Sequence, residues 1–326
     1  MKQYTYSVAI RTLGKAGEKY QRTLDSIKNQ SFQATDIFVY IPDGYDLPKE
    51  TIGIERYIRV TKGMIAQRAL EYKEIEDEWI LFLDDDIFLP PTFMEKAFMA
   101  VDKFDADVIT ANVFLNHTAS LKQKIVMACT GVTPLLSSDW AFKVKTDGRY
   151  KYNNNPKSDF LKTQTGAGPV CLCRKEAFLK MHFEDEKWMD CFGYALGEDQ
   201  LFHYKMYLMG YNLMIWYNSG AIHLDAGSAD RSIDSKYLRK ASACLYLLWH
   251  RSIYNLGNNT FGRKAIVSIS YGLSLFINLM FSFAYVFTKK IYTAPYAILA
   301  GVADGIRFTR NKEYHDIPKF DAYIKK

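Results

Sequence analysis

The sequence is poor in the residues that hold small secreted or zinc-bound domains together. Its 326 residues include only 5 cysteines and 6 histidines, an odd number of thiols without a CxxC pair. A disulfide framework and a structural zinc site are therefore excluded as the basis of the fold. We expect reduced thiols, as in the cytoplasm. Cys171 and Cys173 alternate with Leu172 and are interpreted as packing residues on one face of a strand.

The chain also lacks an arginine-rich stripe and a hydrophobic N-terminal region. Its charged residues, 24% of the total with a formal net charge of +6, are scattered along the chain. This distribution argues against a nucleic-acid partner, while the mild positive charge suits nucleotide phosphates or lipid headgroups. Because the first residues, 1–6, are polar, we expect no signal peptide. A hydrophobic content of 48% is enough for a full core.

Short apolar runs alternate with helical periodicities through the first part of the chain. This alternation predicts an open, mostly parallel α/β sheet, whose ligands bind at the carboxyl ends of the strands. Weak periodicity from residue 112 to 165 predicts a long loop, and a helix is expected to begin at Gly197. The predicted strands are 6–10, 37–41, 54–60, 79–83, 107–111 and 170–173, and the predicted helices between them include 20–27, 65–72 and one opening with a Thr92–Glu95 capping box.

An apolar strand that starts at Trp79 ends in three consecutive carboxylates, Asp84, Asp85 and Asp86. Such charges repel one another unless a cation lies among them, and carboxylate oxygens suit Mg²⁺ or Mn²⁺. The alternative is a solvated acidic turn. Asp43 follows another predicted strand, so we expect it at the same edge of the sheet.

After about residue 231 the alternation of strands and helices ends, and a basic, aromatic helix is expected at 236–254. The apolar segment 265–287 contains no charged residue and is long enough to span a membrane, whereas 291–306 is shorter and contains Pro295. Basic residues flank both segments, which fits a hairpin with both ends in the cytoplasm, and a single span or an interfacial helix stays open. The sequence therefore predicts two regions, 1–231 and 232–326.

Taken together, these features resemble the family 2 glycosyltransferases, nucleotide-sugar enzymes of the GT-A fold, over residues 4–225. The segment 8–12 is similar to the first strand of the family and its nucleotide-contacting loop, with Arg11 in place of the usual proline. Asp84-Asp85-Asp86 resembles the DxD signature, and Glu198-Asp199 resembles the ED motif. The resemblance implies an α/β, Rossmann-like GT-A domain followed by a helical membrane-associated segment.

The family resemblance also implies roles for individual residues. Asp199 is expected to be the general base that takes the proton of the acceptor hydroxyl, with Glu198 binding the acceptor, although the two roles could be exchanged. The implied donor-binding residues are Thr12, Asp43, Arg68, Asp84 and Asp85; the implied metal ligands are Asp86, Asp84 and His223; the implied acceptor-binding residues are Gly168, Trp188 and Glu198.

The resulting functional hypothesis is a metal-dependent, inverting glycosyltransferase that uses Mn²⁺ or Mg²⁺ and a nucleotide-sugar donor. The C-terminal part is similar to rhamnosyltransferase-like members that build bacterial surface polysaccharides. This similarity implies a glycan acceptor carried on a polyprenyl diphosphate at the cytoplasmic face of the inner membrane. Two alternatives remain. One is a nucleotidyltransferase on a similar sheet, although this sequence has no glycine-rich triphosphate loop after its first strand. The other is a non-catalytic, membrane-anchored sugar-binding protein.

Overall fold

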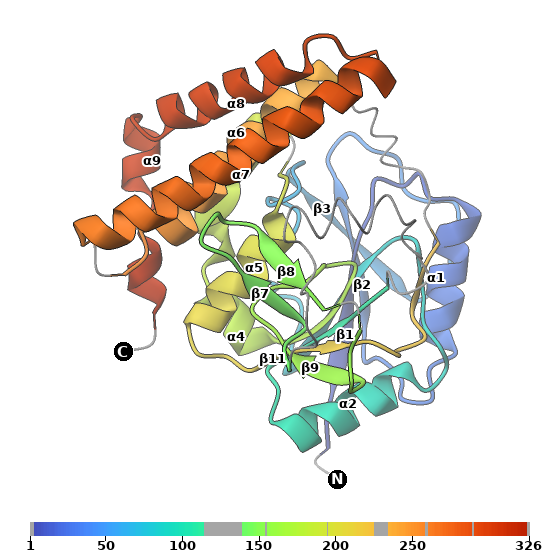
Figure 1. Cartoon of the computed structure of the whole chain (residues 1–326). Coiled ribbons are helices and arrows are strands. Elements are labelled where there is room, and N and C mark those ends of the chain that lie inside the picture. The colour runs from blue at the N-terminus through green and yellow to red at the C-terminus, as the bar shows by residue number, and fades with distance from the viewer. Residues whose placement is uncertain are drawn as a thin grey trace.

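The computed structural model describes residues 3–113, 139–153, 155–193, 195–224, 234–257, 260–288 and 290–324. Within them, an eight-stranded sheet forms the centre of the molecule, in the order β3-β2-β1-β4-β10-β6-β11-β9 (Figure 1). Neighbouring strands are parallel except where β10 pairs with β4 and β6 and where β9 pairs with β11. The predicted open, mostly parallel α/β sheet is confirmed. The strands are β1 (Tyr6–Arg11), β2 (Ile37–Pro42), β3 (Glu55–Val60), β4 (Trp79–Asp84), β6 (Val108–Ala111), β9 (Phe160–Lys162), β10 (Val170–Arg174) and β11 (Leu213–Trp216).

The strand order reverses beside β1, which pairs with β2 on one side and with β4 on the other. In this register Arg11 lies between Tyr40 of β2 and Asp84 of β4. Doubly wound sheets bind ligands outside the carboxyl ends of the strands at such a switch point. The predicted acidic residues therefore end at the place in the sheet where a ligand site is expected.

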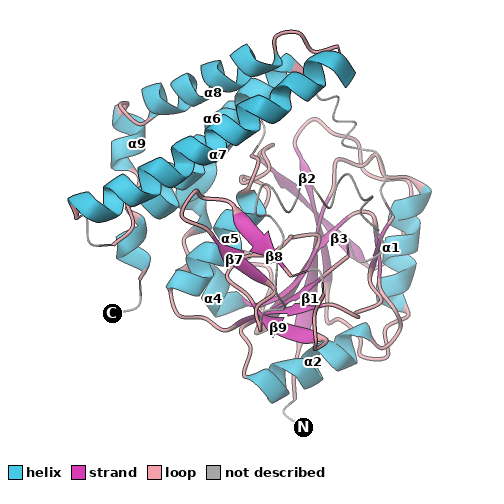
Figure 2. Cartoon of the chain, in the orientation of Figure 1, coloured by secondary structure: helices cyan, strands magenta, loops and turns pink. Residues whose placement is uncertain are grey.

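Apolar side chains on the two faces of the sheet form two core clusters, each covered by helices (Figure 2). On one face, α1 (Glu18–Lys28) and α2 (Phe93–Phe104) contribute Leu24 and Phe98. The other face carries α4 (Lys175–Lys180), the 3-10 helix η1 (Phe183–Phe192) and α5 (Glu198–Leu208). Cys171 and Cys173 are buried in this second cluster, as their alternation predicted.

Three local predictions were wrong. Residues 65–72 contain turns and no helix, and Tyr72 at the end of this segment has a positive φ of 47°. The Thr92 side chain makes no cap bond, and the Glu95 carboxylate accepts from the Ser31 hydroxyl, so the predicted capping box is not formed. The predicted loop at 112–165 contains β9 and a hairpin of β7 (Phe142–Val144) and β8 (Tyr150–Tyr152). These strands are too short to give a clear periodicity in the sequence. Residues 114–138 of the predicted loop lie outside the described part.

The C-terminal region is helical and packs against the sheet domain (Figure 1). Leu247, Phe308 and Phe320 belong to the same core cluster as the second face of the sheet. The predicted boundary at 231/232 lies outside the described residues. The part Phe261–Phe283 of α7, with a mean hydropathy of 1.7, is long and apolar enough to cross a membrane. The elements are α6 (Ser235–Trp249), the π-helix η2 (His250–Tyr254), α7 (Phe261–Thr288), α8 (Ala294–Phe308), α9 (Lys312–Asp316) and η3 (Phe320–Tyr323).

Candidate active site

The three aspartates at the end of β4 differ in their surroundings. The side chain of Asp84 is 33% exposed, whereas Asp85 and Asp86 are buried. Asp85 accepts a hydrogen bond of 2.5 Å from the hydroxyl of Thr12, which ties the ends of β1 and β4 together. Burial, together with the charges of Asp86 and Asp84, raises the pKa of Asp85 to about 6 despite that bond. The turn is therefore an acidic cluster partly withdrawn from water.

Arg11, the last residue of β1, extends into this cluster. Its guanidinium donates to Asp84 Oδ1 at 2.8 Å and lies 3.7 Å from Glu198 Oε1. In the sequence, Arg11 stands out only as a departure from the family pattern, without an implied role. A cationic residue at the end of an otherwise buried strand was the signal that could have identified it.

Arg68 joins the two predicted catalytic acids, although it is 130 residues away from them in the sequence. A single nitrogen, Nη1, donates to Glu198 Oε2 and to Asp199 Oδ1, both at 2.7 Å. Glu198 and Asp199 form the first turn of α5, where the helix dipole favours negative charge. The side chain of Glu198 is 6% exposed and that of Asp199 is 33% exposed, so Asp199 is the more accessible acid.

The surroundings of the pair raise the pKa of Glu198 and lower the pKa of Asp199. Burial and the neighbouring charge of Asp199 raise the pKa of Glu198, and Arg68 offsets only part of this effect. Burial also disfavours ionised Asp199, but the charge and hydrogen bond of Arg68 outweigh it and lower the pKa of that carboxyl. The pair thus combines one ionised, accessible carboxylate with one buried group that retains a proton more readily.

Gly168 fits this cluster because it has no side chain. Its carbonyl oxygen accepts from Arg68 Nη2 at 3.2 Å. A Cβ at position 168 would overlap Oδ1 of Asp199 and crowd Nη2 of Arg68. The backbone at Gly168 therefore lies directly against Arg68 and Asp199, which only a residue without a side chain allows.

Asp190 and His203, which the sequence did not single out, support Arg68 and Asp199 through hydrogen bonds to the backbone. Asp190 accepts hydrogen bonds from the backbone N–H groups of Ile65 and Ala66, at 3.1 and 2.9 Å, in the turn that precedes Arg68. The imidazole of His203 lies 2.7 Å from the carbonyl oxygen of Asp199, and burial lowers its pKa to about 4. Asp190 is more than a hundred residues from Ile65 and Ala66 in sequence, so only the tertiary fold brings it there, whereas His203 contacts Asp199 one turn away in α5.

His223 reaches the acidic turn through a small antiparallel pair. β12 (Ile222–His223) pairs with β5 (Ile87–Phe88), which places His223 Nε2 3.4 Å from Asp86 Oδ1. Among the described residues, no group of three or more histidine, cysteine or acidic side chains surrounds a common point. Asp86 and His223 therefore offer an incomplete set of metal ligands. Mg²⁺ typically binds one or two carboxylates together with substrate phosphates, so this donor set fits a cation that a diphosphate would help to hold.

Two predicted residues lie outside this cluster. Asp43 is exposed in the turn after β2, at the same edge of the sheet but beyond β1. Trp188 is only 4% exposed, and its indole N–H donates to Glu186 at 2.8 Å. The structure does not bring Trp188 to the surface of the site, and in this position its ring packs near Phe192 and Phe308.

The charges gathered at the switch point do not balance. Two guanidinium groups meet five carboxyl groups, and the pKa values of two of those carboxyls are raised. Three of these carboxyl groups are buried and the other two are each 33% exposed, and an excess of carboxyl groups of this kind suits the binding of a cation. The two guanidinium groups belong to Arg11 and Arg68, and the five carboxyl groups belong to Asp84, Asp85, Asp86, Glu198 and Asp199.

The fold and the site define an open α/β protein with an acidic centre at its switch point. No family model matches the sequence, and no curated protein matches it. Solved structures that resemble the chain include residues 1–349 of TarS from S. aureus, with a TM-score of 0.49 and 18% identity, covering 91% of this chain and 78% of that one. Another TarS structure gives a TM-score of 0.47 at 15% identity over 82% of this chain, which spans only 42% of that chain.

GalNAc-T7, solved with UDP, GalNAc and Mn²⁺, is also similar. Its TM-score is 0.48 at 13% identity, and the alignment covers 89% of this chain and 58% of that one. Because these TM-scores lie below 0.5 and the identities below 20%, the similarities by themselves establish neither the family nor the reaction.

Proposed function

We propose that this protein is a metal-dependent, inverting glycosyltransferase of the GT-A type that transfers a sugar from a nucleoside diphosphate to a glycan hydroxyl. The observation that carries the proposal is the convergence of Asp84, Asp86, Glu198 and Asp199 with Arg11 and Arg68 at the switch point of the sheet. A centre with excess carboxylates and two guanidinium groups suits a cation together with a phosphate-bearing substrate.

In this proposal the donor diphosphate lies over the ends of β1 and β4. Arg11 and Arg68 now pair with carboxylates at 2.8 and 2.7 Å, and a diphosphate would compete for the same guanidinium groups. Weakening the bond between Arg68 and Asp199 would let the pKa of Asp199 rise toward its ordinary value. Substrate binding would then make Asp199 a stronger base for the acceptor hydroxyl.

Asp86 and His223, together with Asp84, are the residues that would hold Mn²⁺ or Mg²⁺ beside the diphosphate. When bound, the cation supplies Lewis-acid stabilisation of the negative charge on the departing nucleoside diphosphate. Thr12 supports the site indirectly, because its hydroxyl orients Asp85. Asp43, exposed two strands away from β4, is assigned to the nucleoside end of the donor.

In this proposal the acceptor approaches the accessible side of Asp199 and contacts the backbone at Gly168, while Glu198 lies deeper in the site. The proposed acceptor is a glycan on a polyprenyl diphosphate, used in bacterial surface polysaccharide synthesis at the cytoplasmic face of the inner membrane. The apolar helix α7 supports membrane association. We also propose that residues 1–231 carry transfer and residues 232–326 carry membrane attachment.

The first experiment is a thermal-shift panel of UDP, GDP and dTDP, each with and without Mn²⁺ or Mg²⁺, on the wild type and Asp86→Ala. Ligand that binds only the folded state at about 100 times its Kd stabilises by about 2.7 kcal/mol. We expect one nucleotide to raise the melting temperature only when metal is present, and we expect Asp86→Ala to lose that rise.

Glu71→Gln is a matched control, because Glu71 is an exposed acid paired only with Lys73 and should leave the nucleotide shift intact. The absence of a metal-dependent shift with every nucleotide would contradict the proposal. A larger shift with a nucleoside triphosphate than with the diphosphate would favour nucleotidyl transfer instead.

A further inference from the structure

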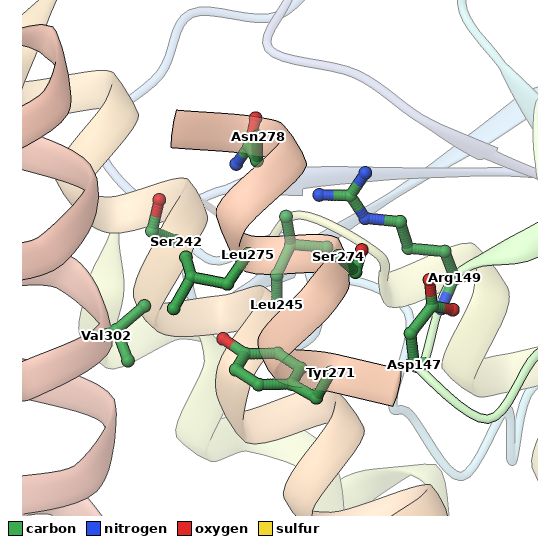
Figure 3. Close-up of a pocket in the computed structure, with 10 residues that line it drawn as sticks. Asp147, Arg149, Ser242, Leu245, Tyr271, Ser274, Leu275, Asn278 and Val302 are labelled. Atoms are coloured by element: carbon green, nitrogen blue, oxygen red, sulfur yellow. The ribbon is translucent and has the colours of Figure 1, made fainter. Parts of the chain in front are cut away.

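Four of the polar residues of α7, Ser270, Ser274, Asn278 and Ser282, lie on the side that faces the protein, whereas Ser268 is exposed. Ser274 and Ser282 are 9% and 0% exposed, and the hydroxyl of Ser270 lies 2.8 Å from that of Thr146. Figure 3 shows Ser274 and Asn278 lining a pocket between α7 and the β7–β8 turn. Helices at a water-exposed surface normally have the opposite arrangement, with polar residues outward. The orientation of α7 therefore indicates that its outer face does not meet water alone.

The outer face of α7 is an apolar stripe that runs along most of the helix. Its members recur at alternating intervals of three and four residues, which places them on one side. The outer side of α8 adds further exposed apolar residues, so the combined surface is two helices wide. Monomeric soluble proteins rarely expose an apolar patch of this extent. We define this outer face as Ile266, Ile269, Leu273, Phe276, Met280, Phe283 and Phe287 of α7 with Tyr296, Leu299 and Ile306 of α8.

The charges around the outer face favour an anionic lipid surface over a second copy of the chain. Residues 261–312 contain seven basic residues and one acidic residue, Asp304. Two copies meeting through this face would bring like charges together, and the stripe of α7 has no flanking acids for pairing across a helix seam. Anionic headgroups complement the same charges. Tyr292 and Tyr296, both 74% exposed, are of a type enriched at membrane interfaces.

The inner face of α7 prevents the helix from crossing the bilayer while the rest of the fold is intact. The ring of Tyr271 stacks on Trp249 of α6 with centroids 4.4 Å apart, and Val267 is 3% exposed within the main core cluster. Leu275 and Leu279 pack against the cluster formed by α6 and α8. A spanning α7 would have to give up these contacts and place its serines in lipid.

We propose that the outer face of α7 and α8 binds the interfacial region of an anionic membrane, with α7 lying parallel to the membrane surface. The proposal specifies the mode of the membrane association suggested above and does not depend on the transfer reaction. The apolar stripe enters the acyl boundary, and the basic residues at the helix ends contact phosphate headgroups. The β7–β8 turn then lies on the inner side of the membrane-bound helix and contacts α5, since Gln200 donates to the carbonyl oxygen of Gly148 at 2.6 Å.

The test is sedimentation of the full chain with vesicles of phosphatidylglycerol and phosphatidylethanolamine, compared with pure phosphatidylcholine. The double variant Phe276→Glu with Met280→Glu should bind the anionic vesicles at least about tenfold more weakly, because two inserted apolar side chains become charged. Ile54→Glu with Met99→Glu is the matched control. Those side chains are 62% and 57% exposed, compared with 59% and 56% for Phe276 and Met280, but they lie outside the outer face. Equal binding by all three proteins would overturn the proposal.

The orientation is tested by attaching a fluorophore to a cysteine introduced at position 269, 276 or 283 in a Cys129→Ser, Cys191→Ser background, which retains only the buried Cys171, Cys173 and Cys244. Quenchers at known lipid depths should report the same shallow depth at all three positions, because the helix lies flat. A steady change in depth along the helix would show a spanning segment and overturn the proposal. A dimer in light scattering that the glutamate variant dissociates, without vesicle binding by the wild type, would assign the face to a second copy.

Discussion

At the scale of single residues, the site depends on one guanidinium shared between two adjacent acids. Arg68 Nη1 lies 2.7 Å from both Glu198 and Asp199, yet their pKa values move in opposite directions, because Arg68 outweighs the effect of burial at Asp199 but not at Glu198. Asp199 is ionised and accessible, which a proton acceptor requires, while the pKa of Glu198 is raised. The structure therefore separates two residues that look equivalent in the sequence.

The proposed role of Asp199 is tested by the isosteric substitution Asp199→Asn. Removing a general base typically costs about 10²-fold to 10⁴-fold in rate, so we expect transfer to fall by this order. Metal-dependent nucleotide binding should stay nearly unchanged, because Arg68 retains Glu198 as a partner. Release of nucleoside diphosphate from the matching sugar donor measures the first quantity, and thermal shift measures the second. If turnover were unchanged in Asp199→Asn but lost in Glu198→Gln, Glu198 would be the general base and Asp199 the acceptor-binding residue.

At the scale of elements, turns within residues 65–72 replace the predicted helix and position Arg68. Ile65, Ala69 and Tyr72 recur at helical spacing, and their side chains are buried together. Helical spacing alone cannot reveal that Asp190 of η1 binds the backbone N–H groups of this segment. A long-range side-chain contact thus overrides the local preference.

Asp190→Ala removes the acceptor for the N–H groups of Ile65 and Ala66. We expect a loss of about 1–3 kcal/mol in the free energy of unfolding, because buried donors lose their partner. Nucleotide affinity should fall as well, since the segment that carries Arg68 is no longer fixed. Denaturant unfolding measures the first effect. Glu184→Ala is the control on the same η1 helix, because Glu184 is exposed and should change neither quantity.

At the scale of the whole molecule, a buried ionic cluster joins the C-terminal region to the sheet domain. Glu186 accepts two hydrogen bonds from Arg251, at 2.8 and 2.7 Å, and one from Lys205 of α5 at 3.3 Å. Burial alone would raise the pKa of Glu186, but Arg251 and Lys205 outweigh it and lower that pKa. Arg251 also lies over the ring of Phe320, so the end of the chain participates in the same cluster.

Arg251→Met should destabilise the whole fold, because it leaves the buried carboxylate of Glu186 with a weaker partner. Breaking a buried ion pair from one side costs about 3–5 kcal/mol. We expect a lower unfolding midpoint in a single transition detected by tryptophan fluorescence. Arg239→Met serves as the comparison, since Arg239 pairs with Asp304 at the surface and should change the midpoint little. Equal midpoints for the two variants would show that the cluster does not join the two regions.

The sequence by itself determined the features that depend on local pattern. Period-two and period-3.6 hydrophobicity specified the strands β1, β2, β4 and β6, the start of α5 and the apolar helix α7, and the order of those elements predicted the α/β class. The acids at the end of β4 were found because three carboxylates after an apolar strand have few structural reasons to be there. Acids at a helix N-terminus are favoured by the helix dipole, so Glu198 and Asp199 were singled out by the family resemblance. The family resemblance added their expected roles.

Only the tertiary structure decided which of these groups meet and which partners they share. Arg11 and Arg68 face the acids because β1 and β4 are parallel neighbours and because Asp190 fixes a turn from over a hundred residues away. Trp188 is buried and Ser274 and Ser282 of α7 face inward for the same reason, since side-chain environment depends on packing between distant elements. Sequence periodicity records which residues share a face, and only the folded chain determines what that face contacts.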